Sequence, residues 1–161
     1  MKKQDIMLIA GLVIIFLISI FALQGTKANK VELPLALTGS EKELTKIDYA
    51  TYEEKTNNGE NFLIIIERTG CGYCEKYMPI VTEVASEKEI PIYYIDTADL
   101  SSEEFTKLEN SNLYLKREQW GTPTTLLLSG NSVAASLGGY VEKDEFVEFI
   151  EKNIKLENAS E

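Results

Sequence analysis

The chain contains no histidine and only two cysteines among its 161 residues. Without histidine it cannot form a Ser-His-Asp or Cys-His catalytic arrangement, and it cannot hold a metal ion or a haem through imidazole. Two cysteines are too few for a four-cysteine metal site, an iron–sulfur cluster or the disulfide network of a small secreted scaffold. We therefore expect the two cysteines to act as a pair, since they stand close together at Cys71 and Cys74.

Positive charge is also scarce, with 16 Lys and Arg residues against 26 Asp and Glu residues and a net charge of −10. A nucleic-acid partner is not expected, because binding to phosphates needs a basic surface. Residues 31–161 hold 12 Lys and Arg against 25 Asp and Glu, a net charge of −13, so the acidity belongs to this part. An acidic surface of this kind would favour basic substrates such as cationic secreted peptides.

A long hydrophobic run covers Ile6–Leu23, in which 18 residues carry no charge. As a helix it would be roughly 27 Å long, about the thickness of a bilayer core. Lys2 and Lys3 precede it, which predicts that the amino end stays in the cytoplasm and the rest of the chain lies outside. The run is longer than the apolar part of a signal peptide, and no small-x-small cleavage site follows it. We therefore favour an uncleaved signal anchor over a cleaved signal peptide and over a buried soluble helix.

Five segments follow from this interpretation. They are a cytoplasmic start at 1–5, a transmembrane anchor at 6–23, a polar tether at 24–43, a globular domain at 44–156 and a tail at 157–161. Pro34 and Gly39 interrupt regular structure in the tether. A location outside the cytoplasmic membrane would allow the two cysteines to form a disulfide.

The globular segment alternates between short apolar runs and amphipathic stretches. Strands are predicted at 44–48, 62–66, 90–95, 124–128 and 132–137, and helices at 49–57, 71–87, 101–117 and 142–154. The run at 62–66 is continuously apolar and rich in β-branched residues, which is typical of a central strand buried on both faces. Gly130-Asn131 predicts a hairpin turn, and Asp48 can cap the first helix. This order predicts an α/β fold whose mixed sheet of four or five strands has helices on both faces.

Cys71-Gly72-Tyr73-Cys74 directly follows the predicted central strand and opens the next helix. The free N–H groups and partial positive charge of a helix N-terminus favour thiolate over thiol at Cys71, and the thiolate is the nucleophile. We expect Cys71 to be the exposed, attacking sulfur and Cys74 the more buried sulfur that resolves a mixed disulfide. Gly72 would leave room for a partner, and Tyr73 could pack beside the sulfurs.

Two other roles for the cysteine pair are open on the sequence alone. A zinc site would need ligands from a second chain, because this chain has no further Cys and no His, so we expect no metal. A purely structural disulfide would close a loop too short to stabilise the fold much through chain entropy. The favoured interpretation is a redox pair that needs no cofactor other than its own disulfide.

A proline, a Thr-Pro pair and a Gly-Gly pair follow the cysteine pair along the chain. Pro79 lies five residues after Cys74, Thr122-Pro123 precedes a predicted strand, and Gly138-Gly139 separates the hairpin from the last helix. On these residues the segment 44–156 resembles the thioredoxin superfamily. The resemblance implies the thioredoxin fold, with a proline kink in the active-site helix. It also implies a cis-proline loop at Thr122 and Pro123 that lies against the dithiol and pairs with the substrate backbone, with help from Gly139.

The chain departs from thioredoxin itself at two positions. Where thioredoxin has a buried Asp in the strand before the pair, this chain has Ile65, and where thioredoxin has a Trp before the first cysteine, it has Gly70. In the family that carboxylate accepts the proton of the buried cysteine, so its absence argues against efficient general reduction. Glu67 could partly replace it, and Arg68 could stabilise the Cys71 thiolate. A solvated surface charge is the alternative for each.

The residues and the resemblance together predict a membrane-tethered, extracytoplasmic thiol–disulfide oxidoreductase. Its partners would be the membrane, thiol- or disulfide-containing secreted or surface proteins or peptides, and a membrane redox partner. Whether it acts as oxidase, isomerase or reductase stays open, because the sequence does not set the reduction potential.

Resemblances to two families bear on the kind of oxidoreductase. Gly-Tyr between the cysteines and Thr before the proline resemble bacterial disulfide isomerases. Those enzymes carry a separate dimerisation domain, for which this chain has no room. An anchor followed by one compact domain is similar to the bacteriocin-transport accessory proteins of Gram-positive bacteria. The alternatives are a binding module for a secretion or bacteriocin transport system with no essential redox role, and a reductase of cytochrome maturation.

Overall fold

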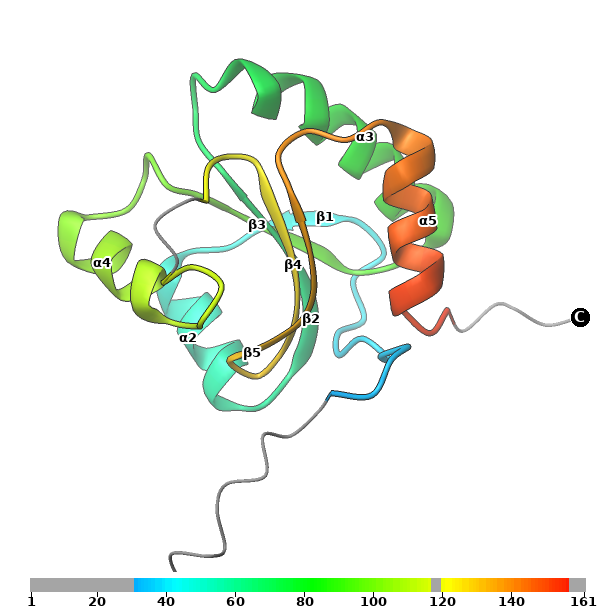
Figure 1. Ribbon diagram of the computed structural model, residues 1–161, viewed down its shortest axis with the longest axis horizontal. Coiled ribbons are helices and arrows are strands. Elements are labelled where there is room, and N and C mark those ends of the chain that lie inside the picture. The colour runs from blue at the N-terminus through cyan, green and yellow to red at the C-terminus, as the bar shows by residue number, and fades with distance from the viewer. Residues whose placement is uncertain (1–30, 117–119, 157–161) are drawn as a thin grey trace, which may run out of the picture. The chain divides into compact units, whose positions relative to one another are not determined.

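The computed structural model describes residues 31–116 and 120–156 (Figure 1). In this part of the chain, strands and helices follow one another in the order predicted. They are β1 (Leu44–Lys46), α2 (Tyr49–Asn57), β2 (Asn61–Glu67), α3 (Gly72–Lys88), β3 (Ile92–Asp96), α4 (Ser102–Asn110), β4 (Thr124–Ser129), β5 (Ser132–Gly138) and α5 (Lys143–Asn153). The predicted α/β class is confirmed.

The strands form one mixed five-stranded sheet in the order β1-β3-β2-β4-β5. β3 pairs in parallel with β1 and with β2, whereas β4 runs antiparallel to β2 and to β5. In the central strand β2, every side chain from Phe62 to Ile66 is 0% exposed. A continuous apolar run is what a strand covered on both faces requires.

Side chains of β2 alternate between two hydrophobic clusters, one on each face of the sheet. Leu63 and Ile65 pack with residues of α3 and α5. Phe62, Ile64 and Ile66 pack with residues of α2 and α4. The helices accordingly lie on the two sides of the sheet in these pairs (Figure 1). This confirms the predicted cover of helices on both faces.

Local side-chain contacts explain where the helices begin and end. The N–H of Thr51 donates to Asp48 Oδ1 at 2.8 Å, which is the cap predicted for the start of α2. The prediction that the next-to-last helix extends to residue 117 is wrong, because α4 ends at Asn110. Beyond it, Asn112 Oδ1 accepts the backbone N–H groups of Tyr114 and Leu115, both at 3.0 Å, and so replaces helical hydrogen bonds with a turn.

The expected tether at 24–43 is wrong for its described part, residues 31–43, which lies against the domain. The N–H of Leu35 donates to the carbonyl of Asn153 at 2.8 Å, and the N–H of Thr38 donates to that of Asn61 at 2.7 Å. The Leu35 side chain joins the cluster under α3 and α5. Its burial depends on contacts with the far end of the chain, which the local pattern of prolines and glycines does not reveal.

The predicted cytoplasmic start, the anchor at 6–23 and the tail at 157–161 lie outside the described residues. Within residues 31–116 and 120–156, we find no helix that is both long enough and apolar enough to cross a membrane.

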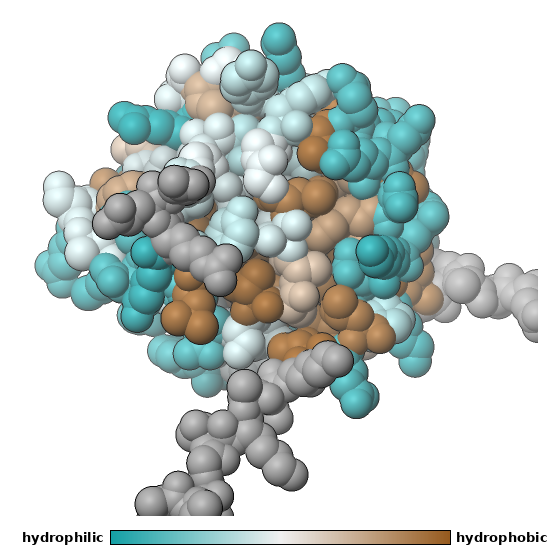
Figure 2. Space-filling view, viewed as in Figure 1, coloured by the Kyte–Doolittle hydropathy of each residue, from teal (hydrophilic) through white to brown (hydrophobic). Residues whose placement is uncertain are grey.

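The surface of the domain is divided between apolar and polar areas. On the face seen in Figure 2, hydrophobic side chains reach the surface over the edge strand β5, whereas α5 is covered by hydrophilic residues. Ala134, Ala135 and Leu137 of β5 are only partly buried. The cysteine pair lies at the N-terminal end of α3.

Candidate functional site

Cys71 and Cys74 are joined by a disulfide bond at the start of α3. Cys71 is the N-cap residue of the helix, and the N–H of Cys74 donates to Cys71 Sγ at 3.2 Å. Cys71 is partly exposed, whereas Cys74 is 1% exposed, which is the predicted order of burial. In the reduced protein, the N–H groups of this helix end would stabilise a negative charge on Cys71 Sγ. An ideal Cβ on the neighbouring Gly72 would meet no atom within 4 Å, so this side of the pair is open.

The segment that leads from β2 into the cysteine pair is held by Asp96 at the end of β3. Asp96 accepts hydrogen bonds from the hydroxyl of Thr69, from the N–H of Thr69 at 3.0 Å and from the N–H of Ala98 at 2.9 Å. Burial alone would raise the pKa of Asp96, but these hydrogen bonds outweigh it and lower the pKa below its ordinary value. Asp96 is therefore an ionised, 3% exposed carboxylate that fixes the loop before Cys71.

The peptide bond between Thr122 and Pro123 is cis. The carbonyl oxygen of Thr122 lies 3.4 Å from Cys71 Sγ, so the loop before β4 contacts the disulfide directly. The N–H of Gly139 donates to the carbonyl of Pro123 at 2.9 Å, and the Gly139 φ of +82° is a conformation that favours glycine. The structure thus brings Cys71, Thr122, Pro123 and Gly139 together from three distant parts of the sequence.

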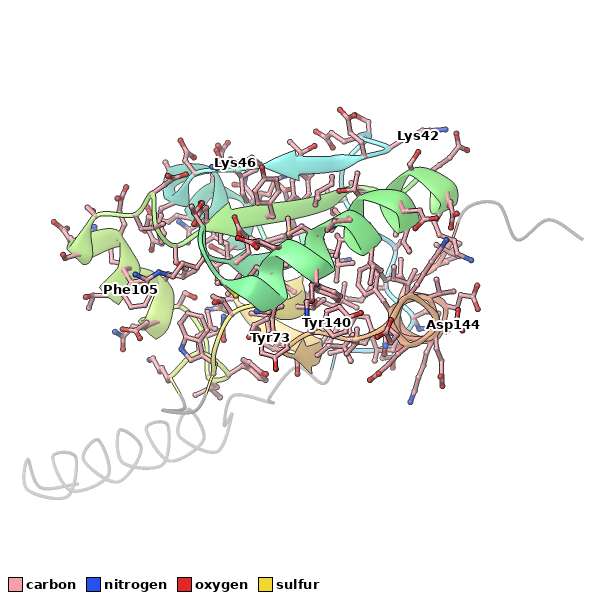
Figure 3. All side chains as sticks on the ribbon, turned by 90° about the horizontal axis from the view of Figure 1, so that it is seen from above. Lys42, Lys46, Tyr73, Phe105, Tyr140 and Asp144 are labelled. Carbon is pink, nitrogen blue, oxygen red and sulfur yellow. A yellow bond between two sulfur atoms is a disulfide. The ribbon has the colours of Figure 1, made fainter. Side chains whose placement is uncertain are left out.

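The exposed Tyr73 and the partly buried Tyr140 form an aromatic surface beside the cysteine pair, which we call the tyrosine surface. Tyr73 is 64% exposed, and its ring centroid lies 6.5 Å from that of Tyr140. Tyr140 in turn lies 6.2 Å from the buried ring of Tyr77. Figure 3 shows Tyr73 and Tyr140 next to each other. Tyr140 was missed in the sequence, although its position directly after Gly138-Gly139 is a signal that could have found it.

The position of thioredoxin's buried Asp is apolar in this chain. Ile65 is 0% exposed and packs in the cluster under α3 and α5. Glu67 lies two residues further along β2, partly buried, and pairs in register with Asp96. Burial and the charge of Asp96 raise the pKa of Glu67 above its ordinary value. A raised pKa is what a proton acceptor at this site would need, and the role of Glu67 stays a prediction.

A cavity of about 450 Å³, which we call the arginine pocket, adjoins the disulfide through Thr122. Its lining includes Arg68, Phe105, Glu109, Lys116, Trp120 and Thr122. The rings of Phe105 and Trp120 lie 6.1 Å apart. Phe105 is drawn on α4, well away from Tyr73 and Tyr140 (Figure 3). Of these residues, only Arg68 and Thr122 were expected at the site from the sequence, because the others come from α4 and the segment after it and share no motif.

Comparison with known proteins identifies the class to which this fold and site belong. Residues 49–154 match the thioredoxin-like domain family, so the chain belongs to that family. Thioredoxin f from spinach chloroplast has a similar structure, with a TM-score of 0.54, 19% identity and coverage of 71% of this chain and 96% of that chain. Thioredoxin from Aeropyrum pernix gives a TM-score of 0.52 at 17% identity, covering 65% of this chain and 82% of that chain. These similarities show the thioredoxin fold.

Similarity in sequence supports the same class. The protein disulfide-isomerase of Ricinus communis is 30% identical over 103 residues, which cover 60% of this chain and 18% of that protein. This chain therefore spans less than a fifth of the length of that relative. The thioredoxin-like domain and its cysteine pair support a thiol–disulfide oxidoreductase kind of activity, with the direction of electron flow unspecified.

Proposed function

We propose that this chain exchanges disulfides with protein or peptide substrates through Cys71. The observation that carries the proposal is the placement of Cys71 Sγ. It is partly exposed, it accepts the N–H of Cys74 at the start of α3, and it lies 3.4 Å from the Thr122 carbonyl. A sulfur in this position can be stabilised as a thiolate and approached by a second sulfur.

The exchange has two steps in the reductive direction. The Cys71 thiolate attacks one sulfur of a substrate disulfide, a bond forms between these two sulfurs, and the other substrate sulfur leaves as a thiolate. Cys74 then loses its proton and attacks Cys71 Sγ, which releases the substrate as a dithiol and leaves the Cys71–Cys74 disulfide. The two Cα atoms are 5.2 Å apart, as such a bond requires. Glu67 would accept the Cys74 proton, and the reverse sequence would oxidise a substrate.

The substrate would lie across Thr122, Pro123 and Gly139. Thr122 contacts Cys71 Sγ directly, Gly139 is hydrogen-bonded to Pro123 beside it, and Cys71 remains partly exposed. Tyr73 and the accessible part of Tyr140 would contact the apolar parts of substrate side chains, because tyrosine rings offer large, rigid contact areas.

We further propose that the domain works outside the cytoplasmic membrane, tethered by the run Ile6–Leu23, on secreted or surface proteins. The length of this run and the preceding Lys2 and Lys3 support this location. A membrane-impermeant thiol reagent applied to intact cells, after reduction, tests it. We expect Cys71 to be labelled in intact cells, and labelling only after lysis would contradict the location.

A trapping experiment tests the exchange itself. With Cys74→Ala, the second step is removed, so mixed disulfides between Cys71 and its substrates should accumulate and appear on non-reducing gels. The matched control is the double variant Cys71→Ala/Cys74→Ala, in which these adducts should vanish. Partners that bind equally well without Cys71 would contradict the enzyme and would instead support a binding module.

A further inference from the structure

The described residues that line the arginine pocket carry a charge opposite in sign to that of the domain. Residues 31–161 carry a net charge of −13. Within the described residues, most lysines are neutralised by ion pairs with carboxylates; these are Lys42, Lys46, Lys55, Lys88, Lys107 and Lys143. The other described cations form no such pair with a described carboxylate; they are Arg68, Lys76, Lys116, Lys152 and Lys155. Of these, Arg68 and Lys116 line the arginine pocket. Among the described lining residues, Glu109 is the one acidic side chain, so these residues together carry a net positive charge.

Two residues that line the arginine pocket, Arg68 and Thr122, contact Cys71. The carbonyl of Arg68 accepts the N–H of Cys71 at 3.0 Å, so Arg68 is tied to the residue that would attack the substrate. Thr122 lines the same cavity and lies 3.4 Å from Cys71 Sγ through its carbonyl oxygen. A substrate cysteine bonded to Cys71 would therefore place the side chain of a neighbouring residue within reach of this cavity.

Two aromatic rings line the arginine pocket together with its cations. Phe105 on α4 and Trp120 before β4 present rings 6.1 Å apart, inclined at 33°. Both rings are partly buried, whereas Arg68 and Lys116 are exposed, so we expect a contact with a carboxylate here to be weakened by salt. A guanidinium group also matches a carboxylate through two parallel hydrogen bonds, which an amide or an ammonium group cannot reproduce.

We propose that the arginine pocket is a specificity site that binds the side-chain carboxylate of a residue adjacent to the substrate cysteine. This proposal rests on the exchange reaction proposed above and names its preferred substrates. Overall acidity would favour basic peptides, whereas this pocket selects an Asp or Glu at one position beside the cysteine. The positively charged pocket thus discriminates among peptides by the charge of one residue, although the domain as a whole is negatively charged.

The test uses the full-length chain with Cys74→Ala, reduced and held in a neutral detergent. Matched short peptides carry one cysteine as a 2-pyridyl disulfide and differ only in a neighbouring Glu, Gln or Lys, placed before or after the cysteine. The Cys71 thiolate attacks the peptide sulfur, a disulfide forms between them, and 2-thiopyridone leaves with the electron pair and is read by its absorbance. We expect the preference at low ionic strength, with the varied residue either before or after the cysteine but not in both positions. There the Glu peptide should react about three- to tenfold faster than the Gln peptide. The Lys peptide should be slowest, and added salt should reduce the differences.

Variants assign the preference to the pocket. Arg68→Gln should bring the Glu-to-Gln rate ratio close to one, and Arg68→Lys should retain part of it. The matched control is Lys152→Gln, which makes the same charge change on the exposed side of α5 and should keep the full ratio. The measured quantity is the ratio of the Glu and Gln rates. Any effect of Arg68→Gln on the reactivity of Cys71 itself is common to all peptides and cancels in this ratio.

Each outcome separates this proposal from the exchange reaction. A ratio near one in the parent protein at both placements, with rapid release of 2-thiopyridone, overturns the specificity site and leaves the exchange standing. A ratio that persists in Arg68→Gln overturns the assignment to this pocket. Release that is no faster than in the double variant Cys71→Ala/Cys74→Ala contradicts the exchange reaction itself.

Discussion

Two surfaces border Cys71, and they differ in charge, in origin and in what they can recognise. The tyrosine surface consists of uncharged rings, and Tyr140 packs on the cluster beneath α3 and α5. The arginine pocket is cationic, and Trp120 packs on the cluster beneath α2 and α4. The disulfide therefore lies where the two sides of the sheet meet. We infer that the tyrosine surface holds many substrates alike, whereas the arginine pocket distinguishes among them.

The difference follows from the kinds of contact that each surface makes. The binding free energy of aromatic rings comes from burying apolar area, which depends little on the substrate sequence or on salt. A charged group contributes to binding only when it meets a complementary charge, and salt screens this contribution. Variants that affect the two surfaces separately should therefore differ in substrate preference and in salt dependence.

The largest effect is expected from Cys71→Ser, which removes the centre shared by both surfaces. A serine hydroxyl is not ionised near neutral pH and cannot form a mixed disulfide, so we expect exchange with every peptide to fall by at least about a hundredfold. Release of 2-thiopyridone measures it. Cys74→Ser is the matched control and should keep the first step, and equal losses in both variants would contradict the assignment of Cys71 as the attacking sulfur.

Asp96→Asn should have the next largest effect, because it loosens the loop that carries Arg68 and leads to Cys71. Losing the charged acceptor of the Thr69 and Ala98 hydrogen bonds should lower the free energy of unfolding by about 1–3 kcal/mol at neutral pH. Because the pKa of Asp96 is lowered in the folded protein, this stabilisation is present above the pKa of an unfolded Asp and is lost as the pH falls through the folded value.

Urea unfolding at several pH values checks this prediction. The difference between the parent protein and Asp96→Asn should shrink toward acidic pH. Asp144→Asn is the control, since Asp144 is exposed on the first turn of α5 and should change stability much less. A difference that grows on acidification would show that Asp96 is not held as a carboxylate.

Tyr140→Ala tests the tyrosine surface alone. Without this ring, Tyr73 loses its aromatic neighbour, and we expect exchange to slow about two- to fivefold for the Glu, Gln and Lys peptides alike. The slowing should be insensitive to salt. Tyr140→Phe keeps the ring and should react as the parent does, and thermal unfolding should establish that both variants are folded. A change in the Glu-to-Lys ratio in Tyr140→Ala would mean that the two surfaces do not act separately.

Glu67→Gln should have the smallest effect and the opposite sign to Asp96→Asn. The raised pKa of Glu67 means that its charged form is disfavoured in the fold, so its contribution is most favourable at acidic pH and is lost as the pH rises through the folded pKa. We therefore expect Glu67→Gln to stabilise the protein at neutral pH by less than about 1 kcal/mol, since solvent screens a partly exposed group. The gain should disappear below about pH 4 in urea unfolding curves; destabilisation at neutral pH would contradict the raised pKa.

Much of the fold could be predicted because its signals are local. The uninterrupted apolar run at 62–66 marks a strand covered on both faces, and Asp48 marks the start of α2. The end of α4 and the packing of residues 31–43 could not be predicted, because they depend on a side-chain hydrogen bond of Asn112 and on contacts of Leu35 with the end of the chain.

The candidate site also contains residues that local sequence predicts and residues that only the folded structure brings together. The cysteine pair and Thr122-Pro123 carry recognisable spacing and neighbours, and the structure places them in contact. The arginine pocket has no such signal, since Phe105 and Trp120 meet only after α4 and the segment before β4 have packed. Nothing in either local sequence indicates that they share a wall beside the disulfide.

The reactivity of Cys71 in the reduced protein tests the central claim most directly. Iodoacetamide alkylation at a series of pH values, followed by mass spectrometry of the separated peptides, gives a rate for each cysteine. We expect the rate at Cys71 to rise with a midpoint below the ordinary thiol pKa of about 8.5, because the start of α3 stabilises its thiolate. Cys74, which is 1% exposed, should react only when the protein unfolds. Equal rates at both cysteines with a midpoint near 8.5 would contradict the claim that Cys71 is an activated nucleophile.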